Sequence, residues 1–236
     1  NDGLYLEKTI KSVLSQKTNL IEYIVVDGGS TDNSKKILKK YSSKIDKIII
    51  RKDKSMYEAI SHGFKISKGK YLAWINSDDL YYKGSLIKVI NLMEKKKINW
   101  VNGIYSTIKE GKLRSPHIPY YYPRNFIKKG LCHKSAYGFI PQESVIFSKK
   151  LYLKSKGFKK NKKIAGDFFL WKKFSSFENL VPVNIKIGIF RKRPGQKTES
   201  QEPYYSELNL KYKKKYFNYL RLILSINYFL TKIILK

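Results

Sequence analysis

The fold is decided by the stretch Ile24-Val25-Val26-Asp27-Gly28-Gly29-Ser30-Thr31-Asp32. Its apolar β-branched residues predict a short buried strand of the kind found in parallel sheets, and that strand ends at an aspartate. The glycine pair and the Ser-Thr-Asp that follow predict a tight turn and the N-terminal cap of a helix. Strand, turn and helix in this order are typical of a sheet whose faces are covered by helices.

The same alternation continues on both sides of this stretch. Apolar residues recur at helical spacing, and short apolar runs without that spacing predict strands. Helices are expected near residues 6–14, 37–41, 56–64 and 86–93, and further strands at 47–51, 71–76 and 100–105. The sequence therefore predicts an α/β fold, with a Rossmann-like, mostly parallel sheet flanked by helices. Residues 106–140 are rich in Tyr, Pro, Lys and Gly and predict irregular structure.

Three predicted strands each end in a carboxylate, namely Asp27, Asp53 and the Asp78-Asp79 pair. Ligands of open parallel sheets bind outside these strand ends, so the three positions predict one binding crevice. The alternative for any single aspartate is a helix cap. Adjacent aspartates repel, and the pair is expected to need a cation or a hydroxyl-rich partner. Mg²⁺ or Mn²⁺ bridging a diphosphate suits one such carboxylate.

The composition is strongly basic. The chain of 236 residues carries 49 Lys and Arg against 18 Asp and Glu, a formal net charge of +31. This charge favours binding to nucleic acid or to an anionic membrane, and codon bias toward lysine is the alternative explanation. The single cysteine, Cys132, excludes an internal disulfide framework. The three histidines lack the spacing of metal ligands.

Several motifs together resemble glycosyltransferase family 2, whose members have the GT-A fold. They span Asn1 to about Phe174 in family order and lie at residues 24–32, 53–63, 75–79, 141–147, 157–158 and 167–171. The resemblance implies an inverting transferase that uses a nucleotide diphosphate sugar, with UDP-sugar favoured. Family members usually begin with an apolar strand before Asn1, so the chain is expected to lack its first strand and to be a fragment.

On the donor side, the resemblance implies that Asp27 and Gly28 bind the nucleotide and that Asp53 contacts the base side. Asp78 would face the ribose or donor sugar, and Asp79 would ligate the divalent cation, Mn²⁺ or Mg²⁺. Ser55, Glu58 and Ser61 depart from the family pattern of Gly, Asp and Asn, and Asn76 replaces a common Asp. These departures leave the donor open.

On the acceptor side, Asp167 stands where the family places its catalytic base, which removes the acceptor hydroxyl proton. The alternative is an aspartate that begins a helix whose Phe168, Leu170 and Trp171 belong to the core. Gln142, Glu143 and Trp171 are expected on the acceptor side, with ordinary loop residues as the alternative for Gln142 and Glu143.

The domain prediction follows from this division. Residues 1–205 would form the transferase domain, with a nucleotide-sugar half at 1–105 and an acceptor half at 106–205. Residues 206–236 combine lysines with Leu, Ile, Tyr and Phe, which predicts a basic amphipathic helix. Its partner would be an anionic membrane, placing the protein in the cytoplasm as a peripheral protein on the inner face of the cell membrane. The alternative is a helix packed on the transferase domain.

The expected acceptor is a saccharide or lipid-linked glycan of a surface polysaccharide. Two other functions remain open: a basic nucleic-acid-binding protein, and a degenerate transferase that binds sugar nucleotide without turnover. No nucleic-acid recognition module is recognisable in the sequence, so a nucleic-acid partner is not expected.

Overall fold

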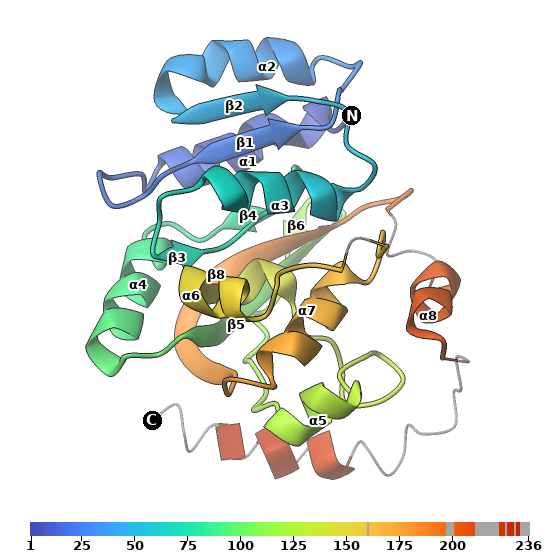
Figure 1. Ribbon diagram of the computed structural model, residues 1–236. Helices are drawn as coiled ribbons and strands as arrows, with labels where there is room; N and C mark the ends of the chain where they lie inside the picture. The colour runs from blue at the N-terminus through green and yellow to red at the C-terminus, as the bar shows by residue number, and fades with distance from the viewer. Residues whose placement is uncertain (160, 197–200, 211–221, 225, 229, 232–236) are drawn as a thin grey trace.

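The protein is described by a computed structural model that covers residues 1–236 except 160, 197–200, 211–221, 225, 229 and 232–236 (Figure 1). Two β-sheets carry helices on their faces, and the expected α/β fold is confirmed. The smaller sheet with α1 and α2 forms one end of the molecule, and α3 lies between it and the larger sheet (Figure 1).

The N-terminal layer contains the deciding stretch. Its elements are α1 (Gly3–Leu14), β1 (Ile24–Asp27), α2 (Ser34–Tyr41), the 3₁₀ turn η1 (Ser42–Lys44) and β2 (Lys47–Ile50). Strands β1 and β2 pair in parallel, with Val25 opposite Ile48. Both helices turn apolar residues toward each other, including Leu6, Ile10 and Leu38, because these recur every three to four positions.

The larger sheet has the strand order β3-β7-β5-β8-β4, with β6 added on β5. Its strands are β3 (Tyr71–Leu72), β4 (Leu80–Tyr81), β5 (Trp100–Lys109), β6 (Lys112–Leu113), β7 (Val145–Ser148) and β8 (Val181–Lys192). The remaining helices are α3 (Met56–Ile66), α4 (Ser85–Lys96), α5 (Arg124–Lys129), the turn η2 (Gln142–Ser144), α6 (Lys149–Lys154), α7 (Gly166–Phe174) and α8 (Glu202–Leu208). Helix α8 contains the predicted boundary between residues 205 and 206. The division of the chain into the domains 1–205 and 206–236 stays a prediction.

The strand directions differ from the prediction of a mostly parallel sheet. Among the strand pairs of the described residues, β1–β2 and β5–β8 are parallel, whereas β3–β7, β5–β7, β5–β6 and β4–β8 are antiparallel. A predicted helix between two predicted strands indicates a crossover and hence a parallel pair. Strands β3, β4 and β6 are only two residues long, so the sequence carries no pattern from which their antiparallel pairing could be predicted. The β5–β6 hairpin turns at Glu110 and Gly111, both with positive φ, as a two-residue hairpin turn requires.

The third expected strand, 71–76, is regular only at 71–72. Among the described residues, β1 pairs only with β2 and β3 only with β7, so the two sheets are not hydrogen-bonded to each other. The space between β1 and residues 71–76 is part of the large cleft described below.

Aromatic side chains fill the core beneath the larger sheet. Trp171 stacks between Trp74 and Trp100, with ring centroids 5.6 and 5.7 Å away. Phe147 of β7 contacts Trp74, Trp171 and Phe174 and is fully buried. Such packing depends on shape, so the loss of one ring leaves a cavity that neighbouring rings do not close.

Part of the C-terminal tail is helical and packs beside α5, as the red segments in Figure 1 show. Ile223 and Leu224 contact the aromatic core, and Thr231 Oγ1 accepts a hydrogen bond from the Tyr121 backbone (2.8 Å). Of the predicted basic segment 206–236, residues 211–221, 225, 229 and 232–236 lie outside the described residues. Within the described part of the chain, no helix combines the length and the apolar character needed to span a bilayer.

We expect Phe147→Ala to lower the free energy of unfolding by about 3–5 kcal/mol, the usual cost of truncating a buried phenylalanine. Urea denaturation followed by tryptophan fluorescence would measure this loss. Leu153→Ala is the control, because this side chain is 63% exposed and its truncation should cost less than about 1 kcal/mol. Equal losses in the two variants would contradict the assignment of Phe147 to the core.

Candidate functional site

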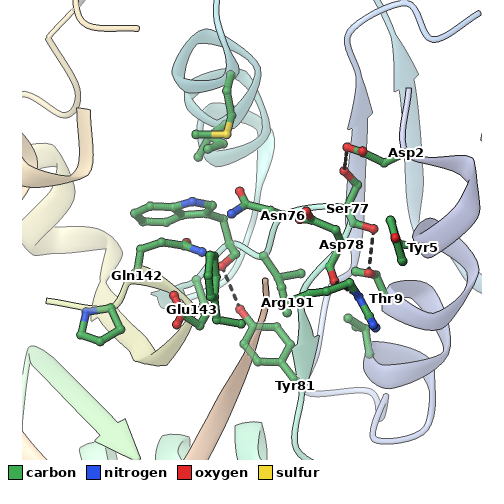
Figure 2. A pocket seen from close by; sticks show the side chains of 18 of the residues that line it. Asp2, Tyr5, Thr9, Asn76, Ser77, Asp78, Tyr81, Gln142, Glu143 and Arg191 are labelled. Carbon is green, nitrogen blue, oxygen red and sulfur yellow. Dashed lines mark hydrogen bonds between the residues drawn. The ribbon is translucent and has the colours of Figure 1, made fainter. Parts of the chain in front are cut away.

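A cleft of about 2200 Å³ lies between the two sheets and is lined by residues from both. Figure 2 shows its centre, where Asp2, Ser77 and Asp78 face Gln142 and Glu143 across the open space. Six of the expected site residues line this cleft, namely Asp27, Gly28, Asp78, Gln142, Glu143 and Asp167. Asp53, Asp79 and Trp171 do not.

The turn after β1 forms one wall of the cleft. Asp27 Oδ1 accepts hydrogen bonds from the Ser30 backbone (3.0 Å) and hydroxyl (2.6 Å). Its Oδ2 is buried and has no hydrogen-bond partner among the described residues. A buried carboxylate oxygen without a partner is costly, which marks Asp27 as a site for a ligand donor such as a hydroxyl or an imide N–H.

The beginning of α1 joins the same wall. Asn1 Oδ1 accepts a hydrogen bond from the Thr31 backbone (2.7 Å), and Asp32 Oδ2 accepts one from Gly3 (2.8 Å). These contacts fix the turn 28–32 against the N-terminus of α1. Asp53 instead lies outside the cleft lining and forms an ion pair with Arg51 (2.9 Å). Its contact with the nucleotide base stays a prediction.

The two departures from the family pattern at the start of α3 have a structural explanation. Ser55 Oγ accepts a hydrogen bond from the Glu58 backbone (3.2 Å), and Glu58 Oε2 accepts one from the Lys54 backbone (2.7 Å). Together the two contacts cap the N-terminus of the helix and hold the residue that precedes the cap. This cap holds α3, whose Tyr57 reaches into the cleft.

The adjacent aspartates Asp78 and Asp79 have different environments. Asp79 is fully buried, and its carboxylate accepts hydrogen bonds from the Arg191 backbone (2.8 Å) and the Asn76 amide (3.1 Å). Burial raises the pKa of Asp79 well above its usual value, and the charges of Glu143 and Asp78 add to this. Asp78 is the member of the pair that lines the cleft. The contacts of Asp79 are therefore structural, and they do not favour it as a metal ligand.

Asp78 is held by β8 and the residues that follow it. Its Oδ2 accepts hydrogen bonds from Arg193 Nε (2.9 Å) and from the Gln196 amide (3.0 Å). Arg193 Nη2 also donates to Asp2 Oδ1 (2.5 Å), and Asp2 Oδ2 accepts from Ser77 (2.6 Å). One guanidinium thus lies between two carboxylates that are 115 and 191 positions away from it in the sequence.

The residues around Asp78 fit a Mn²⁺ or Mg²⁺ ion poorly. The carboxylates of Asp78 and Asp2 share Arg193 as their counter-charge, and the buried carboxylate of Asp79 already accepts two hydrogen bonds from the chain. No group of three or more His, Cys, Asp or Glu side chains in the described residues has the geometry to hold a metal ion. The positive charge at this position comes from the chain itself.

Gln142 and Glu143 lie on the opposite wall, in η2. Both polar atoms of the Gln142 side-chain amide are buried without a partner among the described residues, so this amide is available to a ligand. Gly188 of β8 allows η2 to approach, because a Cβ atom there would lie 2.2 Å from the Glu143 carbonyl oxygen. Burial, together with the charge of Asp167, raises the pKa of Glu143 to about 7.

Asp167 lies in the first turn of α7 and lines the cleft beside Tyr57. Its Oδ1 accepts hydrogen bonds from the Phe168 backbone (2.8 Å) and the Tyr57 hydroxyl (3.2 Å). The pKa of Asp167 is raised to about 6, mainly by burial and to a smaller extent by the charge of Glu207, although the hydrogen bonds to its carboxylate act in the opposite direction. A carboxylate with this pKa, open to a cleft, can accept a proton near neutral pH.

The loop before α7 is positioned by α8. The Glu207 carboxylate accepts hydrogen bonds from the backbone of Lys163 (2.6 Å), Ile164 (3.1 Å) and Ala165 (2.8 Å). Gly166 is required next to Asp167, because a Cβ atom there would lie 2.5 Å from the Tyr57 ring. Trp171 belongs to the aromatic core, as the alternative in the sequence analysis proposed. Its acceptor role therefore has no support from its position.

Comparison with known proteins agrees with this geometry. Residues 1–153 match the family model described as Glycosyl transferase family 2. An uncharacterized glycosyltransferase of Rickettsia typhi is 35% identical over 95 residues, which cover 40% of this chain and 30% of that protein. The minor teichoic acid biosynthesis protein GgaB of Bacillus subtilis is 29% identical over 102 residues, 41% of this chain and 11% of GgaB. The chain thus covers at most 30% of either relative.

Two solved structures share the fold. S. aureus TarS, in complex with UDP-GlcNAc, superposes with a TM-score of 0.66 at 16% identity and covers 96% of this chain and 69% of its own. The mannosyltransferase PcManGT of Pyrobaculum calidifontis, in complex with GDP-Man and Mn²⁺, superposes with a TM-score of 0.63 at 14% identity. The superposition covers 99% of this chain and 71% of the PcManGT chain. These likenesses confirm the GT-A type fold.

We expect Asp167→Asn to stabilise the protein more as pH rises. The pKa of Asp167 is raised from 3.8 to about 6 in the fold, so its contribution to stability is complete below the unfolded value and is lost as pH rises through about 6. The variant does not titrate, and its stability relative to wild type should increase by about 2 kcal/mol between about pH 4 and about pH 8.

Urea denaturation at the two pH values measures this difference. Glu202→Gln, a change at an exposed carboxylate in the first turn of α8, is the control and should show no such trend. A pH-independent difference for Asp167→Asn would contradict the raised pKa.

Proposed function

We propose, since the chain belongs to glycosyl transferase family 2, that it moves a sugar from a nucleotide diphosphate sugar to a glycan or lipid-linked acceptor of a surface polysaccharide. Members of this family are glycosyltransferases, and this chain is one as well. The relationship to GgaB supports a role in cell-surface polymer synthesis. A UDP-sugar is the donor we favour, because TarS binds UDP-GlcNAc in the same fold.

One observation carries the proposal: two carboxylates with different properties line the same cleft. Asp27 has a buried oxygen without a hydrogen-bond partner among the described residues, and Asp167 has a pKa raised to about 6. The first provides an acceptor for the nucleoside, and the second accepts a proton. The basic residue Arg193 and the carboxylate Asp78 lie at the same cleft. We infer that the donor sugar binds between Asp78 and Asp167.

In this arrangement the hydroxyl oxygen of the acceptor attacks the anomeric carbon of the donor sugar, while Asp167 removes the proton of that hydroxyl. The bond between that carbon and the diphosphate oxygen breaks on the opposite face, which inverts the anomeric centre. At neutral pH a carboxyl group with a pKa of about 6 is mostly ionised and therefore ready to act as the base. The Tyr57 hydroxyl keeps this carboxylate oriented toward the cleft.

The described part of the tail supports a membrane partner. Leu222, Ile226 and Leu230 are spaced by four residues and are 61%, 55% and 47% exposed. Ile223 and Leu224 of the same segment pack on the core, so the apolar stripe faces away from it. We propose that this stripe lies on an anionic membrane surface on the cytoplasmic side, where the net charge of +31 adds attraction.

We expect the protein to release a nucleoside diphosphate from one member of a panel of UDP-, GDP- and dTDP-sugars when an acceptor is present. Asp167→Asn should reduce kcat by about 100-fold or more while leaving nucleotide binding unchanged, because it removes only the base. The wild-type kcat/KM should rise with pH up to about 6 and then level off. Glu202→Gln serves as the control for the substitution itself.

Full turnover by Asp167→Asn would contradict its role as the base. Absence of both turnover and nucleotide binding would contradict the proposed function, and strong binding of DNA at physiological salt would then favour a nucleic-acid partner.

We expect the triple variant Leu222→Ser, Ile226→Ser, Leu230→Ser to bind vesicles of anionic lipid at least tenfold more weakly than wild type, because each buried side chain adds roughly 1 kcal/mol or more. Vesicle sedimentation would measure the bound fraction. Leu4→Ser, at a residue that is 80% exposed on α1, is the matched control and should bind normally. Equal binding by the triple variant and the control would rule out this surface.

A further inference from the structure

The guanidinium of Arg193 occupies a position between the carboxylates of Asp78 and Asp2. The two ion pairs measure 2.9 Å from Nε to Asp78 and 2.5 Å from Nη2 to Asp2. The Arg193 side chain is 24% exposed and lines the cleft, so an incoming ligand can reach it. The carboxylates use two of its five N–H donors in the described structure.

Neighbouring residues hold this guanidinium in place. The Arg193 guanidinium lies 5.2 Å from the centre of the Tyr5 ring, and that of Arg191 lies 4.9 Å from the same centre. Arg191 is itself fixed, because its Nε donates to the Asp78 carbonyl (2.9 Å) and its backbone N–H to Asp79. Figure 2 shows Tyr5, Asp78 and Arg191 gathered at this end of the cleft. A side chain ordered before binding loses little further freedom when a ligand binds.

This arrangement has the chemistry of a diphosphate site. A diphosphate brings at least two negative charges to the cleft, and a planar guanidinium can donate paired hydrogen bonds to its oxygens. Asp78 and Asp2 would repel the diphosphate if they had no counter-charge. Arg193 offsets one of these two negative charges, and the neighbouring guanidinium of Arg191 adds a second positive charge. A divalent cation at the same carboxylates would have to approach this fixed positive charge.

We propose that Arg193 is the diphosphate-binding residue of this chain and supplies the counter-charge that would otherwise come from a divalent cation. The inference rests on the proposed function, since it concerns the nucleotide-sugar site. Its consequence is that a nucleoside diphosphate binds without added metal, and that removal of Arg193 makes binding dependent on metal.

The test measures the affinity for UDP, GDP and dTDP by isothermal titration calorimetry on the full chain, in EDTA and in excess Mn²⁺. For the nucleotide that binds most tightly, the wild-type Kd should agree within about threefold in the two conditions. Arg193→Ala should bind at least tenfold more weakly in EDTA, because a charge-assisted contact is lost. Mn²⁺ should restore most of this affinity, since Asp78 and Asp2 are then without a counter-charge.

Two further variants sharpen the test. Lys95→Ala removes a positive charge at an exposed position of α4 outside the cleft lining and should bind like wild type in both conditions. Arg193→Lys keeps the positive charge but loses the planar guanidinium with its paired N–H donors. In EDTA this variant should bind the nucleotide more weakly than wild type but more tightly than Arg193→Ala. A general structural defect would not be reversed by Mn²⁺, so metal rescue distinguishes it from loss of the counter-charge.

The outcomes separate this inference from the proposed function. Wild-type binding only in Mn²⁺, or unchanged affinity of Arg193→Ala in EDTA, would overturn the role of Arg193 while leaving the transferase function intact. Absence of binding by wild type in both conditions would overturn the proposed function and this inference with it. If Arg193→Ala does not fold, the wild-type comparison and Arg193→Lys still decide the question.

Discussion

The buried carboxylate of Asp79 is the contact on which the arrangement of the cleft depends. It accepts the Arg191 backbone N–H of β8, while the backbone carbonyl of Asp79 accepts the Thr9 hydroxyl of α1 (2.8 Å). The turn that contains Asp79 therefore connects α1 of the N-terminal layer with the longest strand of the larger sheet. A buried carboxylate is tolerated only when its hydrogen bonds are made, so these elements are held in one relative position. That position brings Asp2 and Asp78 next to Arg193.

The few acidic residues of this basic protein differ in chemistry because their surroundings differ. Asp78 lies beside Arg193 at the cleft and is paired, whereas burial raises the pKa of Asp167 and Glu143 toward neutrality. A paired carboxylate and a carboxylate that can take up a proton thus lie on opposite walls of the same cleft. This division of roles is what a transfer reaction requires, with a charged donor group at one end and a base at the other.

The site could be predicted from the sequence only where residue type and strand position coincide. Asp27 and Asp78 follow strands, and Asp167 begins a helix, so each could be identified and each lines the cleft. The adjacent Asp79 could not be distinguished from Asp78, because burial and hydrogen bonding, not spacing, separate them. Arg193 gave no signal at all, since it is one of 49 basic residues. Asp2 was missed because its partner is 191 positions away in the sequence.

The sequence by itself determined the α/β class, the order of strands and helices in the first 105 residues apart from the short strand β4, and the strand ends where carboxylates gather. These features are local: periodicity, turn residues and caps act over a few positions. The tertiary structure alone decided the antiparallel pairing of the short strands, the burial of Asp79 and Trp171, and the ion pairs of Arg193. These features depend on contacts between segments far apart in the chain, and no local pattern encodes which partners will meet.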